Sequence, residues 1–128
     1  MITGIEALTQ QALTLALDAA SLRQQAIAAN IANASTPGYA RQRVDFEDQL
    51  DAARRSLSTR GTVDAFSLAQ VRPRMVAAVT EDGMAAAMPQ LDMEVAALTQ
   101  NAVQYQALLK GLSREFAIYS MAVSDGKR

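Results

Sequence analysis

The residue types needed for catalysis are sparse in this chain. Histidine and cysteine are both absent from the 128 residues, which removes the commonest general base, the thiol nucleophile and most ligands for transition metals. The remaining candidates are closely spaced carboxylates, Asp92 with Glu94 and Asp45 with Glu47. Residues two apart on a helix do not share a face, and the helix dipole already explains an acid at a helix start. We therefore expect no catalytic, metal or cofactor site, and no enzyme.

The charged residues do not indicate a nucleic-acid or membrane partner either. The formal net charge is −1, and the charges of residues 41–55 have mixed signs, which favours a solvated face with pairs such as Asp51 with Arg55. The arginines lack interleaved aromatic residues. No apolar run has the length of a membrane span, and no long segment has a lysine-rich polar face suited to lying on a lipid surface. We expect no direct lipid anchoring.

The N-terminal segment lacks the basic-then-apolar pattern of a cleaved signal peptide. Its first charged residue is Glu6, and no lysine or arginine precedes Arg23. A cleaved signal begins with a positively charged stretch followed by an apolar one. The sequence thus predicts that a protein of this kind, if exported, leaves the cytoplasm without such a signal.

Apart from these candidates for catalysis and binding, the most regular pattern is a row of apolar residues between 91 and 123. The steps between its members alternate between four and three, which is typical of a coiled-coil seam. A helix of this length spans about 50 Å at ~1.5 Å per residue, and Pro89 suits its first turn. The row contains Leu91, Val95, Leu98, Ala102, Tyr105, Leu109, Leu112, Phe116, Tyr119 and Val123.

A second row with the same spacing predicts a helix from about residue 4 to residue 33. Thr3 and Glu6 fit a capping box at its start, and Thr36-Pro37-Gly38 is turn chemistry at its end. Asn30 and Asn33 fall in the last turn, where they either cap carbonyls or face solvent, or else make specific hydrogen bonds to a neighbouring chain or to the turn. The row contains Ile5, Leu8, Ala12, Leu15, Ala19, Leu22, Ala26 and Ala29.

The middle of the chain is less regular. Residues 39–46 alternate loosely and suit an extended segment, and a short helix is predicted from about 45 to 58. Residues 59–90 are expected to form a variable loop, with a hairpin around 70–88 as one option. The length fits one domain, so the segments 4–33, 34–58, 59–90 and 90–123 are parts of a single unit.

These elements predict an all-α fold. We expect the two long helices to pack as an antiparallel, coiled-coil-like hairpin, with a short helix and a partly extended, loop-rich middle segment. Both helices carry more apolar surface than one seam requires, and we expect the extra residues to face neighbouring subunits. These residues are Leu13, Leu17, Ile27, Leu108 and Ile118.

Two separated blocks of residues resemble one family. The first combines Ala28-Ala29-Asn30-Ile31-Ala32-Asn33 with Thr36-Pro37-Gly38-Tyr39 and, further on, Arg43-Val44-Asp45-Phe46. It is similar to the N-terminal signature of the bacterial flagellar rod and hook proteins. The second, from Leu91-Asp92-Met93-Glu94-Val95 through Tyr105-Gln106-Ala107-Leu108 to Phe116, is similar to the closing segment of the proximal rod members.

The resemblance implies a structural subunit of the proximal rod of the flagellar basal body, the drive shaft that crosses the periplasm. It implies export by the flagellar type III apparatus and assembly by helix packing. Implied partners are other copies of the chain, the rod protein FlgC, the adaptor FliE, and the export gate or membrane ring. The motif residues that would then serve assembly are Asn30, Ile31, Asn33, Thr36, Pro37, Gly38, Tyr39, Val44, Asp45 and Phe46.

Two alternatives remain open at this point. One is another short axial rod protein of the FlgC kind, although the C-terminal block favours the proximal member. The other is a generic cytoplasmic coiled-coil adaptor, which composition and heptads alone support equally well. A generic coiled coil has no physical need for the Asn-Ile-Ala-Asn and Thr-Pro-Gly-Tyr blocks.

Overall fold

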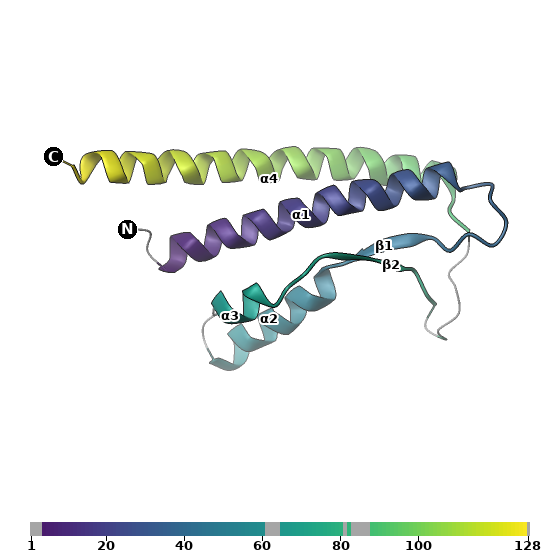
Figure 1. Cartoon of the computed structure of the whole chain (residues 1–128), viewed down its shortest axis with the longest axis horizontal. Coiled ribbons are helices and arrows are strands. Elements are labelled where there is room, and N and C mark those ends of the chain that lie inside the picture. Colours follow the sequence, from purple (N-terminus) through teal and green to yellow (C-terminus); the bar gives the residue numbers. More distant parts are fainter. Residues whose placement is uncertain (1–3, 61–64, 81, 83–87, 128) are drawn as a thin grey trace.

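The computed structural model describes residues 4–60, 65–80, 82 and 88–127. In chain order it contains α1 (Gly4–Ala32), β1 (Gln42–Asp45), α2 (Glu47–Arg60), α3 (Ala65–Ala69), β2 (Arg74–Ala77) and α4 (Leu91–Asp125). Figure 1 shows α1 and α4 side by side and running in opposite directions. Beneath α1 lies a second layer formed by β1, β2, α2 and α3, which we call the arm.

The two long helices lie close to their predicted bounds. The residues that follow α1 and precede α4 explain where these helices end and begin. After Ala32, the side chain of Asn33 donates to the carbonyl of Ala29 at 2.9 Å, and the backbone N–H of Thr36 donates to the carbonyl of Asn33 at 3.0 Å. Gly38 takes a φ of 75°, which glycine adopts without steric cost. The α4 helix begins after Gln90, so Pro89 precedes the first turn that it was predicted to occupy. The predicted capping residue Thr3 lies outside the described residues.

A small antiparallel sheet corrects the all-α prediction. Gln42 pairs with Ala77, and Asp45 pairs with Arg74. The extended segment predicted over 39–46 is therefore present as β1. A hairpin around 70–88 was one option for this segment, and in its described part β2 pairs with β1. Residues 81 and 83–87 of that prediction lie outside the described residues.

The arm closes on itself through one glutamine. The side chain of Gln49, in α2, accepts from the backbone N–H of Arg72 and donates to the carbonyl of Arg72, both at 2.8 Å. This side chain thus replaces a strand partner for the segment between α3 and β2. The predicted short helix over 45–58 is present as α2, whereas α3 lies in a segment that was expected to be a loop.

The main apolar cluster lies between α1 and the arm. Ala19 and Ala26 of α1 are buried together with Val44, Phe46, Leu68 and Val71, and the half-buried residues Leu8, Leu15 and Leu22 pack against this cluster. These α1 residues belong to the row that was expected to pair with the C-terminal helix. For Leu8, Leu15, Ala19, Leu22 and Ala26, the structure shows packing against the apolar residues of the arm. The side chain of Ile5, the first residue of the row, is not among those described.

A different face of α1 contacts α4. A Cβ added at Gly111 would lie 3.7 Å from Leu13 Cδ2, and Asn101 donates to the carbonyl of Ala20 at 2.9 Å. Leu13, Ala20 and Ile27 are seven residues apart, so they share one row of α1. Ile27 is buried. The expectation that Leu13 and Ile27 face neighbouring subunits is therefore corrected, since this row lies against α4.

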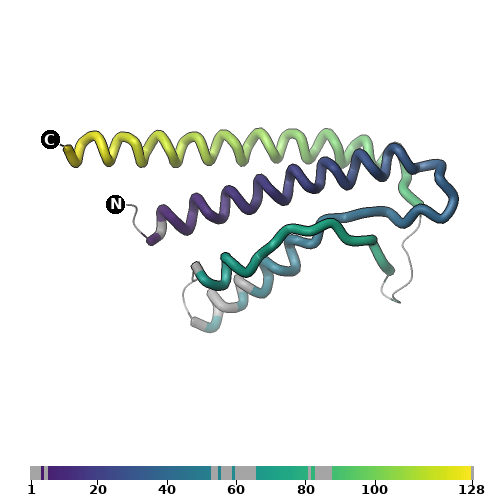
Figure 2. The backbone as a smooth tube through the Cα atoms, viewed as in Figure 1, coloured from purple at the N-terminus to yellow at the C-terminus, as the bar shows by residue number. Residues whose placement is uncertain are grey.

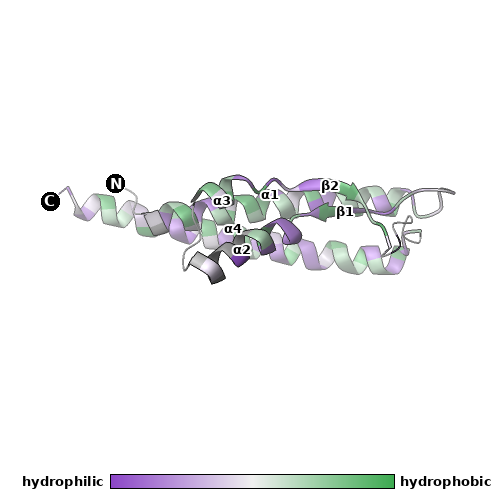
Figure 3. Ribbon diagram, turned by 90° about the horizontal axis from the view of Figure 1, so that it is seen from below, coloured by the Kyte–Doolittle hydropathy of each residue, from purple (hydrophilic) through white to green (hydrophobic). Residues whose placement is uncertain are grey.

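The tube in Figure 2 shows how the connections produce this arrangement. The chain turns at the end of α1, runs through the arm and returns to the same end to begin α4. Both chain ends consequently lie at the opposite end of the helix pair, and α4 extends further than α1 there. Figure 3 shows hydrophobic residues recurring along α4 toward its C-terminal end.

Candidate assembly interface

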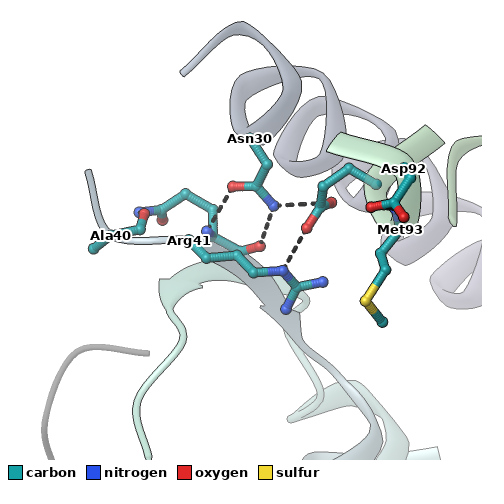
Figure 4. Close-up of polar contacts among 7 residues, drawn as sticks. Asn30, Ala40, Arg41, Asp92 and Met93 are labelled. Carbon is teal, nitrogen blue, oxygen red and sulfur yellow. Dashed lines mark hydrogen bonds and ion pairs between the residues drawn. The ribbon is translucent and has the colours of Figure 1, made fainter. Parts of the chain in front are cut away.

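Asn30 is the centre of a polar junction between α1, β1 and α4 (Figure 4). Its side chain accepts from the backbone N–H of Gln42 at 2.8 Å and donates to the carbonyl of Gln42 at 2.9 Å. Its amide also donates to Glu94 Oε2 at 3.3 Å. Asn30 is 0% exposed, so these bonds satisfy an amide that would otherwise be buried at a cost. The side chain acts as a strand partner for the first residue of β1.

Glu94 carries the negative charge of this junction. It is 1% exposed, and Arg41 Nε donates to its Oε1 (Figure 4). Arg41 remains partly exposed, so the pair contains one desolvated carboxylate and one guanidinium that still contacts water. A buried carboxylate is tolerated only when charge and hydrogen bonds compensate it. The junction of Asn30, Arg41, Gln42 and Glu94 therefore fixes the start of α4 against the end of α1.

Sequence analysis missed Glu94 as a junction residue. The sequence placed it beside the apolar row, where an acid near a helix start has an ordinary explanation. The available signal was its spacing: Glu94 is seven residues before Asn101 and four before Leu98, so all three share one side of the helix. Two polar residues in such a row are typical of positions that fix register.

The turn after α1 contains the other half of the predicted motif. Asn33 caps the carbonyl of Ala29, as one of its two alternatives predicted, and its side-chain oxygen accepts from the Thr36 hydroxyl at 3.2 Å. The backbone N–H of Tyr39 donates to the carbonyl of Thr36 at 3.2 Å. Pro37 and Gly38 are exposed at the tip, and Ile31 and Tyr39 are half-buried. The turn thus delivers Arg41 and Gln42 to Asn30.

The motif residues of β1 and Phe46, which follows it, anchor the arm. Val44 and Phe46 are buried in the cluster against α1. Asp45 Oδ2 faces Arg74 at 3.5 Å and Gln49 at 3.4 Å. A further ion pair joins Arg23 of α1 to Glu47 of α2. These residues have structural partners within the chain, which is why the motif holds the arm in place.

The row predicted along α4 is divided by the structure. Leu98, Leu112, Tyr119 and Val123 are half-buried, and so is Leu108, which was expected to face another subunit. The remaining members of the row are exposed: Leu91, Val95, Ala102, Tyr105, Leu109 and Phe116. Phe116 is 53% exposed. The expectation that this whole row packs inside the subunit is therefore corrected for its exposed members.

Members of the predicted row are exposed because α4 is rotated about its own axis, so that the positions just before them face α1. Glu94 and Asn101 contact α1 directly, and Leu108 continues the same seven-residue spacing. The α1-facing row therefore shares Leu98 and Leu112 with the predicted row, and it contains Glu94, Asn101 and Leu108 where Val95, Ala102 and Leu109 were expected. Val95, Ala102, Leu109 and Phe116, all seven residues apart, form a second row on the flank of α4. We call these four residues the exposed row.

Two further predicted residues lie outside both rows. Ile118 is exposed on α4, and its expected role toward another subunit stays a prediction. Leu17 is half-buried on α1, one turn before Ser21.

No cluster of metal-binding side chains occurs within the described part of the chain. None of the described helices combines the length and apolar character that crossing a membrane requires.

An exposed heptad row on a long helix is suited to packing against another helix. Large apolar side chains at this spacing insert between side chains of a facing helix, and contiguous exposed apolar surface of this kind marks interaction sites. The geometry therefore supports a protein that acts by association.

Comparison with known proteins also indicates a structural protein that acts by association. Residues 11–39 match the family described as "Flagella basal body rod protein", a range that includes Asn30 and the turn after α1. The chain is also 32% identical over 124 residues to the flagellar basal body rod protein FlgB of Bacillus subtilis (strain 168), covering 93% of this chain and 95% of that protein. The chain therefore belongs to the family of flagellar basal body rod proteins, which are structural parts of the bacterial flagellum and not enzymes.

Proposed function

We propose that this chain is a structural subunit of the proximal rod, and that it assembles through the exposed row of α4. The observation that carries this proposal is the division of the α4 heptads into one row against α1 and one row open to solvent. A helix with two apolar rows contributes to two helix contacts at once. Its own subunit supplies the first contact, and a neighbouring subunit supplies the second.

We propose that the exposed row, which carries the large side chains of Val95, Leu109 and Phe116, contacts an unlike patch of the neighbouring subunit. Such heterologous contacts produce rings or open helical assemblies, whereas like-with-like contacts produce closed dimers. A drive shaft requires an open or ring-stacked assembly.

The family places the chain in the basal body, and the finer assignments are part of the proposal. We infer that the subunit leaves the cytoplasm through the flagellar type III apparatus and functions in the periplasmic part of the rod. Its proposed partners are its own copies, FlgC, the adaptor FliE, and the export gate or membrane ring. The 32% identity to a FlgB protein along most of the chain supports the proximal position over a FlgC-like one.

Crosslinking in cells that build flagella tests this proposal. A photoreactive amino acid replaces Leu109 or Phe116 in the exposed row, and the crosslinked partners are identified by mass spectrometry. We expect crosslinks to rod components at both positions. A matched control places the same group at Gln104, which is exposed on α4 but lies on another side, five residues before Leu109.

Exclusive crosslinks from Leu109 and Phe116 to cytosolic proteins would contradict the rod assignment. Equal crosslinking from Gln104 would show that the exposed row has no special part in assembly. Crosslinks to distal rod proteins in place of proximal ones would retain a rod function but reject the proximal position. Each outcome is read from the same samples.

A further inference from the structure

The apolar contact between α1 and α4 does not by itself define how far α4 lies along α1. Leu13, Ala20 and Ile27 repeat every seven residues on α1, and Leu98 and Leu112 lie at a compatible spacing on the facing side of α4. A movement of α4 by seven residues, about 10 Å along its axis, brings apolar side chains opposite apolar side chains again. Heptad rows therefore permit several axial alignments, which we call registers.

Contacts at opposite ends of the helix pair nevertheless agree on one register. At one end, the amide of Asn30 donates to Glu94 Oε2 at 3.3 Å. At the other end, a Cβ added at Gly111 would lie 3.7 Å from Leu13 Cδ2. Glu94 lies 17 residues before Gly111, and Asn30 lies 17 residues after Leu13. One antiparallel alignment therefore satisfies both contacts at the same time.

Asn101 adds a third contact between these two ends. Its side-chain nitrogen donates to the carbonyl of Ala20 at 2.9 Å and to Gln24 Oε1 at 3.0 Å. Among the described residues no donor reaches its Oδ1. The structure describes the whole of α4, and the buried residues of this helix are Glu94 and Asn101. A buried polar side chain in a heptad row selects one register at a cost in stability.

Movement of α4 by one heptad toward the C-terminal end of α1 breaks the contacts at both ends. Glu94 would lie beyond Ala32, the last residue of α1. Ile118, seven residues after Gly111, would then face Leu13. A large side chain would thus take the place of a glycine at which a single added carbon already makes contact. Overpacking of this kind destabilises a contact.

Movement by one heptad in the opposite direction leaves polar groups without their partners. Asn30 would lie beyond Leu91, the first residue of α4, and would lose Glu94. The Glu94 carboxylate would also leave Arg41. It would approach Arg23, a side chain that the arm already holds in an ion pair. A buried polar group that loses its partner costs more than the bond itself was worth.

We propose that Asn101, together with Glu94, selects the register of α4 on α1 and excludes the alternatives one heptad away. This inference concerns a single chain and does not depend on the proposed assembly. Asn101 contributes specificity more than stability, because an apolar side chain in its place would bury more apolar surface and leave no unsatisfied oxygen. The register sets how far α4 extends beyond α1 (Figure 1), and so it places the C-terminal part of the exposed row.

A distance measurement between two spin labels tests this proposal on the isolated chain, which has no native cysteine. Ser21→Cys on α1 and Ser120→Cys on α4 provide exposed labelling sites. In the observed register these sites are about 25 Å apart along the helix axis, and a movement by one heptad changes this separation by about 10 Å. Double electron–electron resonance on frozen samples gives the population of each distance. Trimethylamine N-oxide is added because it favours the folded form.

The labelled native chain is expected to show one distance. In Asn101→Leu, the fraction of molecules at a shifted distance should rise about tenfold, the factor expected for one hydrogen-bonded contact. The double variant Asn101→Leu with Glu94→Leu should raise this fraction further. The control Gln100→Leu places the same side chain at an exposed position of α4 and should retain the single distance. Circular dichroism should show equal helix content in Asn101→Leu and Gln100→Leu, with a thermal midpoint at least as high as that of the native chain.

An unchanged single distance in both Asn101→Leu and the double variant would overturn the proposal, because the apolar rows would then suffice to fix the register. A broad distribution of distances in the native chain would overturn it too, since α4 would then occupy no single register. Loss of helix content in Asn101→Leu or in the double variant would show that these residues are needed for folding itself. That result would contradict a role in choosing between registers.

Discussion

At the scale of single residues, the junction of Asn30, Arg41, Gln42 and Glu94 determines how the three segments meet. Its members come from α1, the segment before β1, β1 itself and α4. The Asn30 amide takes the place of a strand partner for Gln42, and the ion pair with Arg41 compensates the buried carboxylate of Glu94. Because each member satisfies another, loss of one leaves buried polar groups without partners, and such groups cost more than the bond itself was worth.

The variant Asn30→Ala is expected to destabilise the subunit by roughly 2–4 kcal/mol. The backbone N–H and carbonyl of Gln42 would each lose a buried partner, at about 1–3 kcal/mol apiece. Chemical denaturation followed by circular dichroism measures the change in the free energy of unfolding. The variant Gln25→Ala, at an exposed position of the same helix, is the control. A loss below about 0.5 kcal/mol, the size of an ordinary surface effect, would contradict the role of Asn30.

The variant Asn30→Asp is expected to show a pH-dependent loss of stability. The new carboxylate would lie beside Glu94 Oε2, because the native amide nitrogen is 3.3 Å from that oxygen. Two adjacent carboxylates repel when both are ionised, whereas a proton shared between them restores a hydrogen bond. Stability relative to wild type should therefore be lowest near neutral pH and should recover as the pH falls. Thermal melts of both proteins from pH 7 to pH 4.5 measure the difference, and a constant difference would contradict the prediction.

At the scale of elements, α1 is the helix that every other layer contacts. One of its rows packs on the arm through Ala19 and Ala26, and another packs on α4 through Ala20. Its remaining exposed row carries small side chains. Alanine supplies the buried positions on two sides, so neighbouring elements approach α1 closely. The arm and α4 consequently depend on α1 far more than on each other.

Truncation of the arm anchor tests this dependence. The variant Phe46→Ala is expected to destabilise the contact between the arm and α1 by about 3 kcal/mol, since it removes a buried aromatic side chain. The contact between α1 and α4 does not include Phe46 and should persist. Hydrogen exchange measures both in one experiment, with loss of protection expected in β1 and β2 and retained protection in α1 and α4. Phe66→Ala, at an exposed aromatic residue, is the control. Simultaneous loss of protection throughout the chain would show that the layers unfold as one unit.

At the scale of the whole molecule, the subunit leaves much of its helical surface without a partner. The exposed row of α4 faces solvent, and the apolar cluster is confined to one side of α1. Limited burial leaves little free energy to offset the conformational entropy lost on folding. Binding of neighbours to the folded form then stabilises it by mass action. A weakly stable monomer also suits passage through a narrow export channel.

The isolated subunit is therefore expected to unfold at low temperature. Circular dichroism of the dilute protein should show helix content that is largely lost below ~45 °C, the lower end of the usual range for small domains. The helix content should rise with protein concentration, because self-association stabilises the folded form. A cooperative transition above this temperature, independent of concentration, would contradict assembly-linked folding.

Much of the fold is determined by the sequence alone, because its causes are local. Heptad spacing predicts both long helices, and the Thr36-Pro37-Gly38 turn marks the end of the first. The absence of histidine and cysteine and the paired motifs indicate a structural subunit of a known family. Asn30 and Phe46 are recognisable as members of a motif, although their partners are not visible in the sequence. Each of these features depends on residues within a few turns of one another.

Only the tertiary structure decides which row faces which neighbour. Leu8, Leu15 and Leu22 form as regular a row as Leu13, Ala20 and Ile27, and a heptad pattern carries no information about the partner that covers it. The structure assigns the first row to the arm and the second to α4, and it rotates α4 so that Glu94 and Asn101 face α1. The physical reason is that buried polar groups must be paired across segments distant in sequence, as Asn30 is with Glu94. That requirement sets the rotation of α4, and the rotation leaves Val95, Leu109 and Phe116 exposed.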